Sequence, residues 1–222
     1  MSKDHLRVLV GIPSGNLWHA KFGLSLASLM VRFAMVQVPG YASQELRVAN
    51  IRSSILPRNR LDIVKAAKAE HADYLLFLDC DHVFPPDLLH KLLAHGKPVV
   101  AANCVTKQIP AQTTARAEGN GEQGVPVFSD PDKEGLEQVW RVGTGVMLIH
   151  SSVLAKIPHS CWGMTYREEL DTYQGEDWGF CHACEAAGIP IFVDHTQSRR
   201  VGHEGYFNFT HDVVGEVRCS PD

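Results

Sequence analysis

Short apolar runs and longer helical patterns alternate along this chain. Residues 8–12, 74–78 and 98–102 are apolar runs too short for a core helix, which is typical of buried strands in a parallel sheet. Residues 23–36 are apolar on nearly all sides, which predicts a helix that other elements cover well. Residues 61–67 carry apolar side chains at helical spacing. Strands and helices therefore alternate, as expected of an α/β protein.

The second half of the chain continues this alternation. Two prolines open the helix expected over residues 85–96, because proline is tolerated in a first turn, and a glycine ends it. A strand with a Gly-Thr-Gly interruption is expected over residues 139–149, followed by a short helix over 151–157. Residues 176–187 predict a further helix that ends at a glycine, and residues 189–193 predict the next strand.

One long segment breaks the pattern. Residues 106–137 are rich in Gly, Pro, Gln and acidic residues without a clear period, which predicts a mobile loop that could act as a lid. A chain of 222 residues lies within the usual size range of one domain. We therefore expect a single α/β domain over residues 1–222, with a mostly parallel central sheet and helices on both faces.

Charge is distributed unevenly along the chain. The net charge of −4 excludes a uniformly basic nucleic-acid-binding protein. Residues 47–68 nevertheless hold six Lys or Arg against one Asp, and residues 118–137 hold six acids against one Lys. The basic segment has two interpretations that charge alone leaves open, a focused anion site or a solvated helix face.

Targeting signals are not apparent in the sequence. No apolar run approaches the roughly 18 residues of a membrane span, and the N-terminus lacks the apolar stretch of a signal peptide. We expect a cytoplasmic protein with no membrane partner and no obligate protein partner. The six cysteines should then be reduced. Cys181 and Cys184 have the spacing of half a zinc site, but no second ligand pair is visible, which favours buried helix cysteines.

Two carboxylates follow the most strand-like segment. Asp79 and Asp81 come directly after residues 74–78, and ligands of open α/β sheets bind at the carboxyl ends of strands. In an extended chain positions two apart face the same side, so both carboxylates could point together. Their repulsion would be relieved by a divalent cation that also binds phosphate oxygens. Acids after strands also serve as helix caps, so this pattern alone does not establish a metal site.

Four stretches in order carry a resemblance to a known family. Residues 72–85, which contain Asp79-Cys80-Asp81, resemble the Asp-x-Asp region of glycosyltransferases with the GT-A fold, near family 2. Residues 58–61 look like the upstream basic element, residues 142–149 resemble the glycine-containing strand, and residues 175–181 look like the acidic motif of that family. Two histidine-containing segments follow, and the resemblance covers residues 6–207.

The resemblance implies a role for each matching residue. Asp79 would lie near the donor ribose and the metal, Asp81 would ligate Mn²⁺ or Mg²⁺ through the nucleotide diphosphate, and His203 would complete metal or diphosphate binding. Asp177, or alternatively Glu176, would take the position of the catalytic base of inverting members. The residues expected to hold the nucleotide are Pro13, Ser14, Arg58, Arg60 and Gly145.

Elementary chemistry supports these implied roles independently of the resemblance. Sugar transfer needs a cation to neutralise the leaving diphosphate and a carboxylate to accept the proton of the acceptor hydroxyl. Asp177 opens a helix whose dipole favours an ionised carboxylate, but a structural helix cap would look the same. We interpret His82 and His195 as structural histidines with satisfied hydrogen bonds. Trp162 and Trp178 could be core residues or platforms for the acceptor.

The implied activity is transfer of a sugar from a nucleoside-diphosphate sugar, with UDP as the expected nucleotide, to a hydroxyl acceptor. The chain resembles small glycosyltransferases of bacteriophage and environmental viral genomes, which implies a host cytoplasm and makes a hydroxymethylated pyrimidine in DNA the narrowly preferred acceptor. Arg52, Arg58, Arg60, Arg199 and Arg200 could contact DNA phosphates, or they could only hold the donor diphosphate.

Other functions remain open. A glycan or small hydroxyl compound could be the acceptor. A nucleotidyltransferase would release pyrophosphate and usually carries a glycine-rich basic loop after its first strand, whereas residues 11–16 contain no Arg. A binding module would keep donor affinity without turnover.

Overall fold

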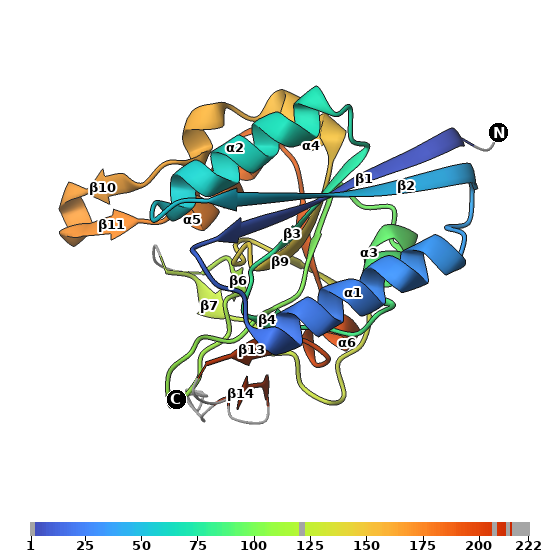
Figure 1. Cartoon of the computed structure of the whole chain (residues 1–222). Helices are drawn as coiled ribbons and strands as arrows, with labels where there is room; N and C mark the ends of the chain where they lie inside the picture. The colour runs from blue at the N-terminus through green and yellow to red at the C-terminus, as the bar shows by residue number, and fades with distance from the viewer. Residues whose placement is uncertain (1–2, 120–122, 206–207, 212–213, 215–222) are drawn as a thin grey trace.

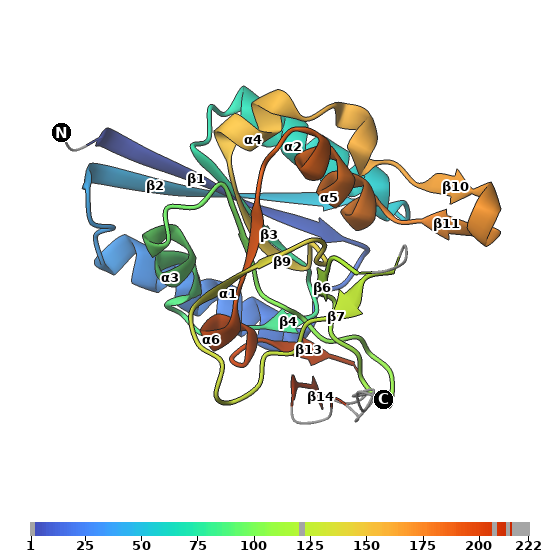
Figure 2. The ribbon, with the colours of Figure 1, turned by 180° about the vertical axis from the view of Figure 1, so that it is seen from behind.

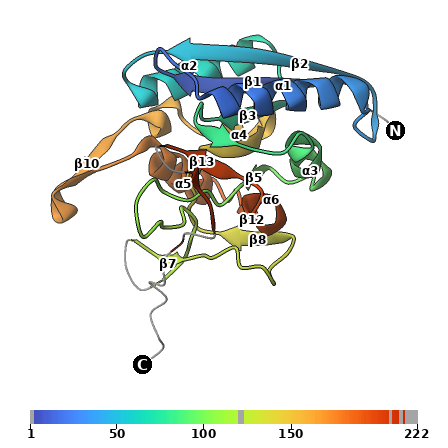
Figure 3. The same cartoon turned by 60° about the horizontal axis from the view of Figure 1, so that its bottom comes forward.

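A seven-stranded sheet forms the centre of the molecule. The computed structural model describes residues 3–119, 123–205, 208–211 and 214. The strands of this sheet lie in the order β2-β1-β3-β9-β5-β12-β8. Their bounds are β1 Lys3–Ser14, β2 Tyr41–Arg52, β3 Tyr74–Leu78, β5 Val99–Ala101, β8 Leu136–Val139, β9 Val146–His150 and β12 Ile191–Asp194. Figure 3 shows β2 and β1 along one edge, with β12 and β8 toward the other.

Most strands of this sheet run in the same direction. β1 pairs in parallel with β2 and β3, and β12 pairs in parallel with β5. Strand β9 is antiparallel to both of its neighbours, and β8 is antiparallel to β12. The prediction of a mostly parallel α/β sheet is therefore confirmed. The segment expected as one interrupted strand over residues 139–149 is instead two strands, because residues 140–145 leave the sheet between them.

Helices cover both faces of the sheet, as predicted (Figure 1). One face carries α2 (Leu56–Ala69), α4 (Ser151–Lys156) and α5 (Glu176–Ala186), and the other carries α1 (Ala20–Met35) and α3 (Leu88–Ala94). Alternate residues of one strand supply the two cores, because successive side chains point to opposite faces. On β3, Leu75 and Phe77 join the core under α2 and α5, whereas Leu76 and Leu78 join the core under α1 and α3.

Helix α1 departs from its predicted environment. Its inner face is buried through Phe22, Leu26, Leu29 and Phe33. Its outer face is apolar as well, yet it lies exposed, with Leu24 and Met35 among the most exposed apolar side chains. The prediction that this all-apolar helix is well covered is therefore wrong within the described chain, since only one face is packed on the sheet.

Smaller elements surround the carboxyl ends of the strands. Strand β4 (His82–Val83) pairs with β13 (Gly202–Glu204), which pairs with β14 (Asn208–Phe209). The hairpin of β10 (Thr165–Arg167) and β11 (Thr172–Gln174) projects from the body (Figure 2). The remaining short elements are β6 Arg116–Ala117, β7 Val125–Pro126, α6 His195–Ser198 and the 3₁₀ helices His159–Trp162 and Glu168–Leu170. None of the described helices is long and apolar enough to cross a lipid bilayer.

Parts of the segment predicted as a mobile loop are built into the core, whereas other described parts, such as residues 107–110, are exposed. Strands β6 and β7 pair with each other, and Ala115 and Val127 are buried in the core under α5. The Asn103 amide group donates to the Val127 carbonyl at 2.7 Å, and its oxygen accepts from the Ala115 N–H at 2.9 Å. The mobility of residues 106–137 stays a prediction, and residues 120–122 lie outside the described chain.

The cysteines agree with the reduced, buried interpretation where they are described. Cys80, Cys104, Cys161, Cys181 and Cys184 are free thiols, and Cys219 lies outside the described residues. Burial raises the pKa of Cys181 to about 12, so its thiol stays protonated. Cys184 is fully buried on the same helix. A protonated, buried thiol pair is a poor zinc ligand, which favours a packing role.

Candidate active site

The chain turns sharply where β3 ends. The Asp79 carbonyl accepts a hydrogen bond from the His82 N–H at 3.1 Å, which closes a turn over residues 79–82. Neighbouring segments hold this turn: the Asp79 N–H donates to Gly145 at 2.8 Å, and the Cys80 carbonyl accepts from His19 at 3.1 Å. The backbone is therefore not extended at these residues. The expectation that Asp79 and Asp81 share one face of a strand is wrong, and their side chains enter different clusters.

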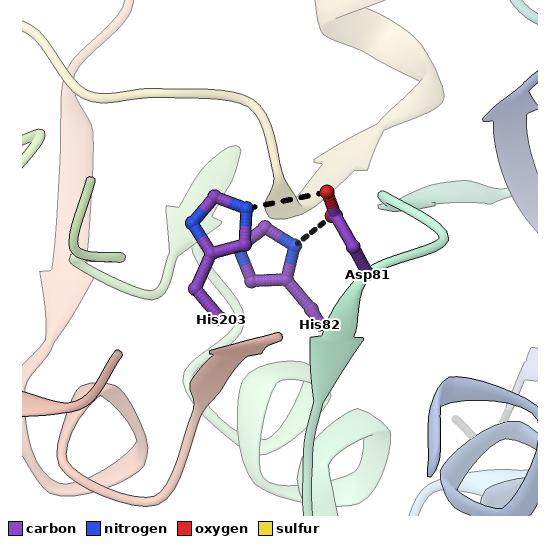
Figure 4. Close-up of side chains that lie close together, drawn as sticks. All are labelled: Asp81, His82 and His203. Carbon is purple, nitrogen blue, oxygen red and sulfur yellow. Dashed lines mark ion pairs between the residues drawn. The ribbon is translucent and has the colours of Figure 1, made fainter. Parts of the chain in front are cut away.

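Asp81 lies in a cluster with His82 and His203 (Figure 4). One ligand atom from each side chain lies within 4.8 Å of the others. The Nδ1 atom of His82 is 3.3 Å from Oδ1 of Asp81, and Nε2 of His203 is 3.4 Å from Oδ2. The pairing of β4 with β13 places His82 opposite His203, which explains how residues far apart in the sequence meet. Lys107 forms a further ion pair with Asp81.

One nitrogen atom of each imidazole faces Asp81. Nδ1 of His203 is 2.8 Å from the Val105 carbonyl, which can only accept, so Nδ1 carries the proton and Nε2 faces the carboxylate. His82 is 2% exposed, and neither ring nitrogen has a hydrogen-bond partner among the described residues. The two rings stack with centroids 4.3 Å apart and planes 14° apart. Buried polar atoms without partners are costly, and a shared cation would satisfy them.

The donor set fits a divalent cation. Metal-bound histidines usually donate their other ring N–H to a carbonyl, as His203 does to Val105. Burial raises the pKa of Asp81, but His203, His82 and Lys107 together hold that pKa well below its usual range, so the carboxylate is ionised. Two imidazoles and one carboxylate suit Mn²⁺ or a later transition ion better than Mg²⁺, which prefers oxygen ligands.

Asp79 belongs to a second cluster, centred on Arg60. The Arg60 Nη2–H donates to Asp79 at 3.0 Å, and its Nε–H donates to Glu176 at 3.0 Å. Arg60 is 2% exposed, and its guanidinium also lies over the Phe77 ring at 5.2 Å from the centroid. Burial lowers the pKa of Arg60, but the two carboxylates more than offset this, and it stays charged. Arg60 therefore links the end of β3 to the start of α5.

Gly145 lies where the two clusters meet. A Cβ atom at this position would lie 2.7 Å from Cε1 of His82 and 3.3 Å from Oδ2 of Asp79. The first distance is shorter than side chains tolerate, so a residue with a side chain would displace His82. Glycine is needed here because the backbone passes close to both functional groups.

Asp177 lies next to Glu176 in the first turn of α5. Its Oδ1 atom accepts the Trp178 N–H at 2.8 Å, which satisfies one of the unpaired amides at the helix start. Burial and the neighbouring charge of Glu176 raise the pKa of Asp177. The two carboxylates are thus differentiated: Glu176 is held by Arg60, whereas Asp177 is half-buried and its pKa is raised above that of an ordinary aspartate.

Four of the residues expected to hold the nucleotide lie at the end of β1 and the start of α2, whereas Gly145 directly precedes β9. Pro13 and Ser14 are buried, and the Ser14 hydroxyl oxygen accepts from the Asn50 amide at 2.7 Å. Arg58 is exposed and lies 3.6 Å from Asp62 one helical turn later. Arg60, in contrast, points inward to the carboxylates. Nucleotide contacts of all four residues remain predictions.

The structure separates the other candidate residues. The structural interpretation of His195 is confirmed, since its ring nitrogens lie 2.9 Å from Ser129 and from Glu137. The same interpretation is wrong for His82, as its nitrogens have no hydrogen-bond partners in the described chain. Trp162 is a core residue, 1% exposed and stacked on Phe180, so the acceptor-platform interpretation is wrong for it. Trp178 is half-buried, with the Arg141 guanidinium 4.1 Å from its ring centroid.

Two residues of the site were not among the sequence candidates. His82 directly follows Asp81, and its position could have been found from the Asp-Cys-Asp-His run if a turn rather than a strand had been expected there. Lys107 carries no sequence signal, because it reaches Asp81 from a segment without periodicity. Glu176 and Asp79 were candidates, but their link through Arg60 depends on the tertiary fold.

Comparison with known proteins identifies the fold and no family. No protein-family model matches this chain, and it matches no curated protein. Among solved structures it is similar to A197 from STIV, with 19% sequence identity and a TM-score of 0.58. That match covers 93% of this chain and 91% of A197. At this identity the likeness shows the fold alone, an α/β fold of the GT-A type.

Proposed function

We propose that this protein is a metal-dependent glycosyltransferase that moves a sugar from a nucleoside-diphosphate sugar to a hydroxyl acceptor. The observation that carries the proposal is the cluster of Asp81, His82 and His203 at the carboxyl end of a central strand. The fold supports it as well. Ligands of open α/β sheets bind outside the carboxyl ends of the strands, and this cluster lies at the carboxyl end of β3.

The chain's own side chains divide the work of this reaction. Asp81, His82 and His203 would hold Mn²⁺, with Mg²⁺ a poorer fit to this donor set. The bound ion would supply charge neutralisation for the leaving diphosphate. Lys107, beside Asp81, would add a second positive charge at the same place.

Asp177 is the group best suited to accept the proton of the acceptor hydroxyl. Glu176 is engaged by Arg60 at 3.0 Å, so its oxygen is already occupied by a permanent cation. A base must be ionised at working pH yet able to bind a proton, and the raised pKa of Asp177 moves it toward that condition. Arg60 would keep Asp79 and Glu176 in place without reacting itself.

A nucleotidyltransferase is a second candidate, supported by one contact. The loop after β1 contains no Arg, but Arg52 reaches it from β2, with Nη2 3.2 Å from Oδ1 of Asn16. A basic side chain therefore does lie against this loop. The two activities differ in product: a glycosyltransferase releases a nucleoside diphosphate, whereas a nucleotidyltransferase releases pyrophosphate.

The acceptor is predicted from resemblance alone. Of the arginines considered for DNA contacts, Arg200 pairs with Asp87 at 2.9 and 3.2 Å, and Arg199 donates to the Asp130 carbonyl at 2.8 Å. Arg52 and Arg58 remain exposed. A hydroxymethylated pyrimidine in DNA, a glycan and a small hydroxyl compound therefore all belong in the test.

The decisive experiment offers a panel of nucleotide sugars, UDP-sugars first, with each acceptor class in the presence of Mn²⁺. Wild-type protein should release a nucleoside diphosphate only when the metal is present. Asp81→Asn should abolish this metal-stimulated release. Asp177→Asn should lose transfer but keep donor binding measured by calorimetry. Release of pyrophosphate would establish the nucleotidyltransferase instead, and donor binding without any turnover would identify a binding module.

A further inference from the structure

The outer face of α1 is an exposed apolar surface without a cover in the described chain. Leu24, Val31 and Met35 are 70%, 57% and 80% exposed and recur at the spacing of one helix face. Leu17, just before the helix, is 84% exposed. The inner face of α1 is apolar too and packs on the sheet. The helix is therefore apolar on both sides, a pattern typical of helices that are fully buried.

A shallow groove runs along this surface. It has a volume of about 520 Å³ and is bordered by Val31, Arg32, Met35 and Pro86, so it lies between α1 and the turn that precedes α3. Contiguous exposed apolar patches mark contact sites in soluble proteins more often than scattered single residues do. We call the exposed residues 17, 24, 31, 32 and 35 the α1 surface.

The charge of this region is of one sign. Residues 15–44 contain Lys21 and Arg32 but no Asp or Glu. Acids on neighbouring elements are already paired: Glu204 with Lys21 at 3.2 Å, and Asp87 with Arg200 at 2.9 Å. Arg32 has no ion-pair partner among the described residues. The α1 surface therefore combines apolar side chains with an uncompensated cation.

A second copy of the chain fits this surface poorly. A twofold contact brings one patch against itself, and this patch has no acid to pair with the partner's Arg32. A 16-residue helix is about 24 Å long and about 10 Å wide, which covers on the order of 240 Å² in projection. Stable dimers bury about 800 Å² per partner. An anionic lipid surface needs neither a matching acid nor a large rigid contact.

We propose that the α1 surface docks on membranes that carry anionic lipids. Leu24, Val31 and Met35 would enter the headgroup and acyl-chain boundary, and Arg32 would pair with lipid phosphates. Trp18, beside this surface and 40% exposed, is of the residue type that is enriched at membrane interfaces. This proposal replaces the expectation that the protein has no membrane partner.

The position of α1 relates this surface to the candidate active site. The His19 N–H, just before the helix, donates to Cys80 next to Asp81, and Lys21 in its first turn pairs with Glu204 next to His203. The N-terminal end of the docked helix would therefore lie nearest to the metal-binding cluster. Resting on the proposed function, this geometry favours a hydroxyl acceptor carried on a lipid or presented at its surface.

Vesicle co-sedimentation tests the docking without any substrate. Wild-type protein should bind vesicles of phosphatidylcholine with phosphatidylglycerol, and less strongly when salt is raised. Val31→Gln with Met35→Gln should lower the partition coefficient more than tenfold, and Arg32→Gln should lower it about fivefold. Because no donor sugar is present, a failure here would leave the glycosyltransferase proposal intact.

A matched control comes from the projecting hairpin. Met164, directly before β10, and Tyr173, in β11, are exposed apolar residues of similar exposure, 56% and 64%. The hairpin of β10 and β11 projects from the body on the side away from α1 (Figure 1). Met164→Gln with Tyr173→Gln should bind vesicles like wild type. Equal loss in both double variants, or no vesicle binding by wild type, would overturn the proposal. A wild-type dimer in light scattering that Val31→Gln with Met35→Gln makes monomeric, without vesicle binding, would assign the α1 surface to a second copy.

Discussion

Asp79 and Asp81 are two residues apart, yet the fold balances their charges in different ways. Asp79 is paired at 3.0 Å with Arg60, a buried and permanent cation that also holds Glu176. Asp81 is surrounded by two imidazoles at 3.3 and 3.4 Å and by Lys107. Arginine cannot lose its proton in a protein, whereas imidazole can be neutral and offer a lone pair.

This difference suggests separate roles for the two clusters: the Arg60 cluster stabilises the fold, and the Asp81 cluster binds a cation. In the Arg60 cluster a permanent cation is paired with two carboxylates, and the cluster joins β3 to α5, so it should contribute mainly to stability and to the position of the acids, although Arg60 Nη1 and Asp79 Oδ1 have no hydrogen-bond partner among the described residues. The Asp81 cluster contains buried nitrogen atoms without hydrogen-bond partners in the described chain, so it should be completed by an external cation. Four substitutions test this division, in order of expected effect.

Arg60→Met should be the most destabilising. It leaves the partly buried Asp79 and the buried Glu176 without their cation, and breaking a buried ion pair from one side costs about 3–5 kcal/mol. Urea unfolding followed by circular dichroism measures this loss. Arg58→Met, two residues earlier and exposed, is the control and should leave the unfolding midpoint nearly unchanged. Similar midpoints for both variants would contradict a structural role of the Arg60 cluster.

Asp81→Asn should act on metal binding rather than on stability. Removal of the only carboxylate of the cluster should weaken Mn²⁺ binding roughly 100-fold or more in calorimetry. Asp79→Asn is the counterpart, and it should retain Mn²⁺ binding within about tenfold while it lowers the unfolding free energy. Equal loss of Mn²⁺ binding in both variants would mean that the two carboxylates form one site.

The sequence predicted the parts of this picture that depend on local pattern. Apolar runs marked β3 and β5, and the helices with clear spacing were found within a few residues of their bounds. Strand β2 was missed because it is an edge strand that is only partly buried, so its residues form no apolar run. The short hairpin strands were missed for the same reason.

The site was predictable only as a set of candidates. Asp81 and His203 were named from the resemblance, and they meet because β4 pairs with β13. That pairing over about 120 positions has no local signal. Asp79 and Asp81 enter different clusters because the chain turns between them, and two acids two positions apart are equally compatible with a strand or a turn. The ion pair of Lys107 with Asp81 could not be predicted, because Lys107 lies in an irregular segment whose path has no sequence signal.

Gly145→Ala should disturb the metal cluster without removing any ligand. The added Cβ would lie 2.7 Å from the His82 ring, so the ring must shift from its present position beside Asp81. Mn²⁺ affinity should fall about tenfold, as is typical when a metal ligand loses its orientation. Gly143→Ala is the matched control, since its Cβ would meet only Thr114, at 3.2 Å. Unchanged Mn²⁺ binding in Gly145→Ala would show that His82 is not a ligand.

Asp177→Asn should have the smallest effect on stability, and its sign is opposite to the first prediction. The folded protein raises the pKa of Asp177 above the ordinary value of 3.8, because burial and Glu176 disfavour its charge. The ionised carboxylate therefore costs stability at neutral pH, and a neutral amide that still accepts the Trp178 N–H removes this cost. The variant should be more stable than wild type by a few tenths of a kcal/mol at pH 7.

The pH dependence distinguishes this cause from altered packing. As the pH falls through the raised pKa, the native carboxyl binds its proton before the unfolded chain does, so wild type regains the difference. The two unfolding curves should coincide below the ordinary pKa of 3.8. Glu176→Gln should change stability in the other direction, because it removes a partner of Arg60. A gain for Asp177→Asn that persists at low pH would mean that charge burial is not its origin, and that Asp177 is not poised to accept a proton.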